Sequence, residues 1–178
     1  MKVVLVNLRH TFAVLLFFTS LSAYSQKYVH GDSTVVKGIR EVLSGLYGKN
    51  DTTIYFITKH QFQKVSTAAS EITVEKKKGI ITRIAINSAT TQGYLAEEYW
   101  LDNNQLIFVY QTFGYYRELN PVTKEVNFKG QRYWEARYYF QNERVKYEAA
   151  TGTREKALTY TEVDLISQKN KLLEYIKN

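Results

Sequence analysis

The stretch Glu98–Tyr110, EYWLDNNQLIFVY, decides the fold because the chain repeats its pattern 39 residues later as Arg137–Ala149, RYYFQNERVKYEA. In both copies, aromatic and apolar residues flank a polar pair, which is Asn103-Asn104 in the first and Asn142-Glu143 in the second. Asn adopts a positive φ more readily than most residues, as the two-residue turns of β-hairpins require. The sequence therefore predicts the same β-hairpin twice.

The turn positions predict which residues face each other across each hairpin. Counting outward from Asn142-Glu143 pairs Phe140 with Val145 and Tyr138 with Tyr147. A shift of one residue would move every side chain to the other face of the sheet. The predicted faces therefore depend entirely on this register.

The outer face of the first hairpin is the main candidate for a binding site. The same count sets Trp100 opposite Ile107, with Val109 on the same face, so this hairpin is apolar on both sides. Two interpretations stay open: a terminal helix covers this face, or Trp100, Ile107 and Val109 form an exposed ligand-binding surface. Three more candidate ligand contacts lie in the long segment between the hairpins, where connections are often functional: Tyr115, Tyr116 and Arg117.

Helical patterns flank the strands at both ends of the chain. Apolar residues recur at three- and four-residue steps between 33 and 47 and between 159 and 177, where Thr159 and Glu162 predict a capping box. Between the helices, the pattern predicts strands at Thr53–Thr58, Ile72–Glu75, Ile80–Ile86, Tyr94–Leu101, Leu106–Gln111, Val122–Phe128, Tyr133–Phe140 and Arg144–Ala149. The expected fold class is α+β: an antiparallel β-meander of about six to eight strands, strongly twisted or partly closed, with an N-terminal and a C-terminal helix.

Residues 1–25 have the pattern of a cleaved secretory signal peptide. Lys2 and Arg9 accompany the apolar run Phe12–Leu21, and Ala23 and Ser25 are the small residues that precede a cleavage site. The run is shorter than the roughly 20 apolar residues of a membrane span. We therefore expect an exported protein, periplasmic or secreted, whose mature chain is a single α+β domain of residues 26–178 without a transmembrane segment.

The composition narrows the chemistry that the chain can perform. It has no cysteine, so neither a disulfide nor a thiol nucleophile is available, and its three histidines offer little for a metal site. No Gly-rich phosphate loop, zinc spacing or nucleophile elbow occurs, so no catalytic residue, metal or cofactor is predicted. The net charge is +7, but the basic residues are interspersed with acidic ones. Together with the predicted signal peptide, this mixing argues against a nucleic-acid partner. Five glutamates near strands offer material for carboxylate chemistry, although ion pairing explains them as well: Glu97, Glu98, Glu118, Glu135 and Glu148.

These observations favour a non-catalytic exported binding module, although enzymatic activity stays open. The expected partner is a small apolar molecule, a glycan or a protein of the cell envelope, bound through an aromatic sheet face. One alternative is a carboxylate-dependent hydrolase of envelope polysaccharide. The other is a structural or inhibitor-like module that acts through protein contacts.

Overall fold

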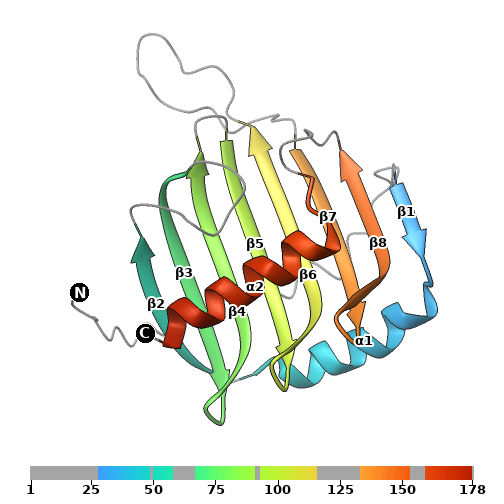
Figure 1. Ribbon diagram of the computed structural model, residues 1–178, viewed down its shortest axis with the longest axis horizontal. Helices are drawn as coiled ribbons and strands as arrows, with labels where there is room; N and C mark the ends of the chain where they lie inside the picture. Colours follow the sequence, from blue (N-terminus) through green and yellow to red (C-terminus); the bar gives the residue numbers. More distant parts are fainter. Residues whose placement is uncertain are drawn as a thin grey trace.

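The structure is a computed structural model that describes residues 28–48, 50–57, 67–90, 93–115, 133–152 and 159–177. The predicted signal peptide, 1–25, and the predicted strand Val122–Phe128 lie outside these ranges. Within them, an eight-stranded antiparallel sheet carries one helix on each face (Figure 1). The strands are β1 (Tyr28–Gly31), β2 (Asp51–Ile57), β3 (Thr67–Lys77), β4 (Ile80–Thr90), β5 (Gly93–Asp102), β6 (Gln105–Tyr115), β7 (Tyr133–Gln141) and β8 (Arg144–Gly152). The helices are α1 (Thr34–Leu46) and α2 (Glu162–Lys177).

The sheet is an antiparallel meander with one added strand. β2 to β8 follow one another in chain order, and β1, which the sequence analysis did not predict, pairs with β8. β1 and β2 are therefore the two edges of a sheet whose described pairings are open rather than closed. The antiparallel meander and both terminal helices are confirmed.

The three tight hairpins of the meander share one geometry. Each turns on two residues with positive φ: Lys78-Gly79 (54° and 80°), Asn103-Asn104 (49° and 66°) and Asn142-Glu143 (53° and 56°). After the second residue pair from each turn, the strand that follows the turn has one residue without a partner in the preceding strand. This residue is Thr82 in β4, Ile107 in β6 and Lys146 in β8. The β3–β4 hairpin therefore has the same turn and the same extra residue as the two hairpins of the sequence repeat.

The extra residue, a β-bulge, makes the predicted hairpin register wrong beyond the first pairs. Phe140 does pair with Val145, but Tyr138 pairs with Glu148 and Tyr147 pairs with Tyr139. Tyr138 and Tyr147 consequently belong to different cores, one on each face of the sheet. A bulge sets two residues of one strand against one of its partner, which reverses the alternation past that point.

In the first hairpin the same bulge separates residues that were expected to share a face. Trp100 pairs with Phe108, and Tyr99 pairs with Val109. Trp100 and Ile107 pack on the side of α1, whereas Val109 lies in the core beneath α2. The predicted surface of Trp100, Ile107 and Val109 is therefore not one face of the sheet.

Two hydrophobic cores separate the sheet from its helices. The smaller core, beneath α1, has four buried members: Ile39, Leu43, Trp100 and Tyr139. The larger core, beneath α2, includes Leu165 and Leu172 from the predicted apolar stripe of that helix. Its largest fully buried side chains are Trp134, Tyr99, Tyr138, Phe113 and Phe140. Both faces of the sheet are therefore used for packing.

The ends of α1 follow from local hydrogen bonds. The Thr34 N–H donates to the Asp32 carboxylate (2.9 Å), which satisfies one exposed donor of the first turn. Gly48, with φ of 146°, lies just past the end of the helix, where glycine is favoured. The Lys77 ammonium donates to the carbonyl of Gly45, so the β3–β4 turn anchors the C-terminal end of α1.

The capping box of α2 lies two residues further along than predicted. The Thr161 N–H donates to Asp164 Oδ2 (2.7 Å), and the Asp164 N–H donates to Thr161 Oγ1 (3.3 Å). Because α2 begins at Glu162, Thr161 and not Thr159 occupies the capping position. No helix in the described part of the chain is long and apolar enough to cross a membrane.

Candidate functional site

The face of the sheet that carries α1 is built from straight cross-strand rows of side chains. The row nearest the hairpin turns, from β3 to β8, is Glu75, Arg83, Trp100, Phe108, Tyr139 and Tyr147. The next row is Thr73, Ala85, Glu98, Tyr110, Arg137 and Ala149. The third row is Glu71, Asn87, Ala96, Thr112, Glu135 and Thr151. α1 packs on the first row, along the turn end of the sheet (Figure 1), so the polar second and third rows lie beyond the helix.

The structure answers the question of what lies over Trp100. Its side chain is only 2% exposed, and it packs with Ile39 and Leu43 of α1. The ring of Tyr47, just past the end of α1, lies 4.8 Å from the Trp100 ring. Of the two interpretations of this face, the structure shows the covered one. Ile107 packs against the same cluster, which leaves no exposed apolar surface centred on these side chains.

The other predicted contacts lie elsewhere. Val109 is fully buried beneath α2. Tyr115 packs edge-on against Phe113, with ring centroids 4.7 Å apart. Tyr116 and Arg117 lie outside the described residues. A role of these residues in ligand binding stays a prediction, but the described ones do not converge on a single site.

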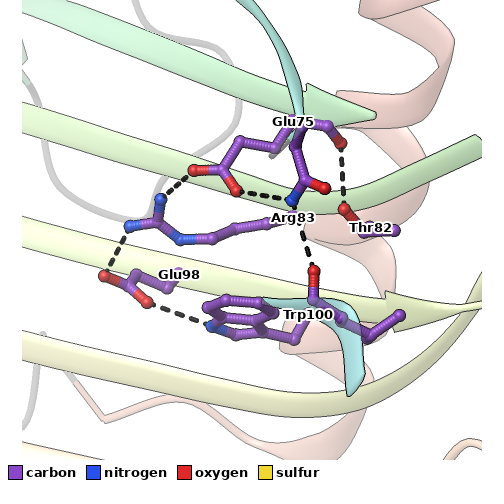
Figure 2. Close-up of polar contacts among 7 residues, drawn as sticks. Glu75, Thr82, Arg83, Glu98 and Trp100 are labelled. Atoms are coloured by element: carbon purple, nitrogen blue, oxygen red, sulfur yellow. Dashed lines mark hydrogen bonds and ion pairs between the residues drawn. The ribbon is translucent and has the colours of Figure 1, made fainter. Parts of the chain in front are cut away.

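Arg83 is the centre of a charged network at the edge of the α1 core (Figure 2). Its guanidinium bridges Glu75 (2.5 Å) and Glu98 (2.7 Å), and the Trp100 indole N–H donates to the same Glu98 carboxylate (3.0 Å). Burial opposes the charge of Arg83, but the two carboxylates outweigh it and raise the pKa of its guanidinium. The guanidinium also lies 5.3 Å from the centre of the Trp100 ring. These contacts hold the Glu98 carboxylate in one position.

A second network lies on the same face, one and two rows further from the turns. The Tyr110 hydroxyl donates to Glu135 Oε2 (2.8 Å), and Arg137 pairs with Glu135 Oε1 (2.9 Å). The Arg137 guanidinium lies 5.3 Å from the centre of the Tyr110 ring. Burial first, and the Glu135 charge second, raise the pKa of the Tyr110 hydroxyl, so it stays a neutral donor. Glu135 and Arg137 are two residues apart in β7 and therefore lie on one face of the sheet.

Glu98, the second network and Tyr94 lie on one face of the sheet. We call these five residues the polar strip: Tyr94, Glu98, Tyr110, Glu135 and Arg137. Tyr94 is 43% exposed, and the register places it on the same face as Glu98. Small residues separate Tyr94 from the charged groups: Ala96, Thr112 and Gly114. An exposed aromatic ring, a phenol and an ion pair therefore lie on one sheet face with little bulk between them.

A fully buried carboxylate lies on the opposite face. Glu97 is 0% exposed; its Oε1 accepts from Gln111 Nε2 (2.6 Å), and its Oε2 accepts from Gln168 Nε2 of α2 (2.9 Å). The Tyr99 hydroxyl also donates to it (3.4 Å). Sequence reasoning singled out no glutamate as desolvated, because alternation does not show what α2 brings over the sheet. These bonds join the helix to the sheet.

The described residues limit the remaining chemistry. No group of three His, Cys, Asp or Glu side chains among them could hold a metal ion. One surface hollow of about 600 Å³ lies between the β7–β8 turn and α2, and one of about 210 Å³ lies between the end of α1 and two hairpin turns. Neither is lined by the polar strip. No protein-family model, curated protein or solved structure matches the chain.

Proposed function

We propose that the protein is a non-catalytic binding module that recognises a glycan through the polar strip. The observation that carries the proposal is the fixed geometry of Tyr110, Glu135 and Arg137 on the sheet face that also carries the exposed Tyr94. A tyrosine ring offers a flat apolar face for the C–H groups of a sugar. A carboxylate and a guanidinium held by their own contacts offer acceptors and donors to its hydroxyl groups at little entropic cost.

The other ligands that the sequence suggested have less support. A small apolar molecule would need an exposed apolar surface, and α1 covers the one expected around Trp100. A carboxylate hydrolase needs two carboxyl groups that converge across a cleft. Glu97 and Glu98 lie on opposite faces, while Glu98 and Glu135 each pair with an arginine. The hydrolase and the protein-interaction module are therefore the alternative proposals, behind the glycan-binding module.

The proposed place of action is the cell envelope or the exterior. It is supported by the signal pattern of residues 1–25. The proposed partners are accordingly envelope glycans rather than nucleic acids. The basic balance of the chain from residue 26, +5 (22 − 17), adds a general attraction to acidic polysaccharides.

Titration calorimetry against a panel of envelope polysaccharides tests the proposal. Tyr94→Ala and Arg137→Ala should each weaken binding about tenfold or more, because each removes a direct contact. The matched controls are Tyr47→Ala, which removes a tyrosine of similar exposure (40%), and Arg144→Ala, which removes an arginine outside the strip. Binding that the strip variants and their controls reduce equally would contradict the proposal, as would a panel without any ligand.

A further inference from the structure

The two edges of the sheet differ in how they are protected. β1 has four residues and ends at Gly31, whose backbone lies directly against the carbonyl of Lys146. β2 has seven residues, and all seven pair with β3 without a register shift. Between Asp51 and the end of the strand, β2 contains no charged residue, glycine or proline. Ile54, at its centre, is 40% exposed.

A regular uncharged edge strand is an unusual surface for a protein to leave open. Its outer side presents N–H and C=O groups that can pair with another extended segment. Proteins normally prevent this by making edge strands short, by charging them or by inserting a bulge. β1 follows this rule through its length, whereas β2 shows none of these features after its first residue, Asp51. β2 is therefore built like a strand that has a partner.

We propose that β2 pairs antiparallel with β2 of a second copy, about a twofold axis that passes through Ile54 perpendicular to the sheet. This symmetry keeps each face of the sheet on its own side and sets residue 54 against its twin. Thr52 then faces residue 56, and Asp51 faces residue 57, so no like charges meet in the strand pair. The charge of Asp51 is already opposite Lys76 on β3. Without Lys2 and Arg9 of the signal segment, two copies with a net charge of +5 each (22 − 17) can thus approach along this edge.

The size of the contact predicts a weak, concentration-dependent dimer. Seven paired residues and the side chain of Ile54 form a smaller interface than the roughly 800 Å² per partner of stable complexes. The consequence for binding, which rests on the proposed function, is that both polar strips would lie on the same side of one continuous sheet. A repetitive polysaccharide could then contact both strips and gain avidity.

Sedimentation velocity from roughly 10 μM to roughly 1 mM tests the proposal on the chain from residue 26, since every described element lies within 28–177. Wild-type protein should shift from monomer to dimer, and Ile54→Lys should weaken dimerisation at least about tenfold by setting two ammonium groups against each other. Ile80→Lys is the matched control, because Ile80 is 45% exposed but lies at the β3–β4 turn, and it should dimerise like wild type. If circular dichroism shows that Ile54→Lys does not fold, Thr52→Lys places the charge on the same exposed edge.

Three outcomes would overturn the dimer. One is a wild-type protein that stays monomeric at roughly 1 mM. Another is an equal effect of the two lysine substitutions. The third is slow hydrogen exchange, at every concentration, of the β2 amides that point away from β3, because it would show that another part of the same chain already covers the edge. A wild-type protein that dimerises but binds no polysaccharide of the panel would count against the proposed function alone.

Discussion

Glu97 and Glu98 are consecutive residues of β5, and their carboxylates lie on opposite faces of the sheet. The two carboxylates differ in burial and in the groups that they bind. Glu97 is fully buried and accepts hydrogen bonds from two glutamine side chains. Glu98 is partly exposed and accepts from the guanidinium of Arg83. The first fastens α2 to the sheet and the second belongs to the polar strip. One dipeptide therefore serves both layers of the molecule.

Glu97→Ala should destabilise the fold strongly. It leaves the amide groups of Gln111 and Gln168 buried without their acceptor, at about 1–3 kcal/mol for each, or roughly 2–6 kcal/mol in total. The matched control is Glu98→Ala, which should cost less because it leaves one buried donor without an acceptor, the Trp100 indole N–H, while the Arg83 guanidinium keeps Glu75. Urea denaturation of both variants measures the difference. A larger loss for Glu98→Ala would contradict the role assigned to Glu97.

Trp100→Ala should lower the free energy of unfolding by about 3–5 kcal/mol, the usual cost of removing a large buried aromatic side chain. The ring is 2% exposed and packs between the sheet and α1. Val163→Ala is the control: Val163 is 73% exposed on α2, so its removal should change stability by no more than about 0.5 kcal/mol. A Trp100 variant as stable as the wild type would show that α1 does not cover this ring in solution.

The stability of the protein should fall at high pH. Burial, followed by the nearby Glu97 charge, raises the pKa of Tyr99 well above its ordinary value of 10.0. The unfolded chain therefore releases this proton first, so the stabilisation is complete below about pH 10 and is lost as the pH rises toward the folded-state pKa. Urea denaturation at about pH 8 and about pH 11 measures the loss. Tyr99→Phe should reduce the difference between the two conditions, and an unchanged difference would contradict this assignment.

Two glycines should respond in opposite ways to alanine. At Gly31 the backbone has φ of 106°, and a Cβ there would overlap the carbonyl oxygen of Lys146. Gly31→Ala should therefore separate β1 from β8, which hydrogen exchange of the β1 amides would detect. At Gly38, within α1, a Cβ would meet nothing within 4 Å, so Gly38→Ala should raise stability by about 1 kcal/mol. A stabilising Gly31→Ala would show that β1 is not held as described.

The candidate site shows where sequence reasoning succeeds and where it fails. The pairing of Glu135 with Arg137 on one face was predictable, because residues two apart in a strand share a face. The joint role of Tyr110 was not, since its hydroxyl reaches Glu135 only across the β6–β7 pairing. Seventeen residues, 116–132, separate β6 from β7 in the chain, so the local pattern does not show how the two strands pair. Tyr94 was assigned to a strand, yet nothing in alternation marked its ring as exposed.

The sequence by itself determined the turns, most of the strands and both helices, since positive-φ residues, alternation and apolar stripes are properties of short segments. Only the tertiary structure decided the register past each bulge. Both faces of the repeated hairpins carry apolar side chains, so either register buries apolar surface and the alternation cannot choose between them. It also decided that α1 covers Trp100 and that α2 encloses Glu97, because those contacts join segments far apart in the chain.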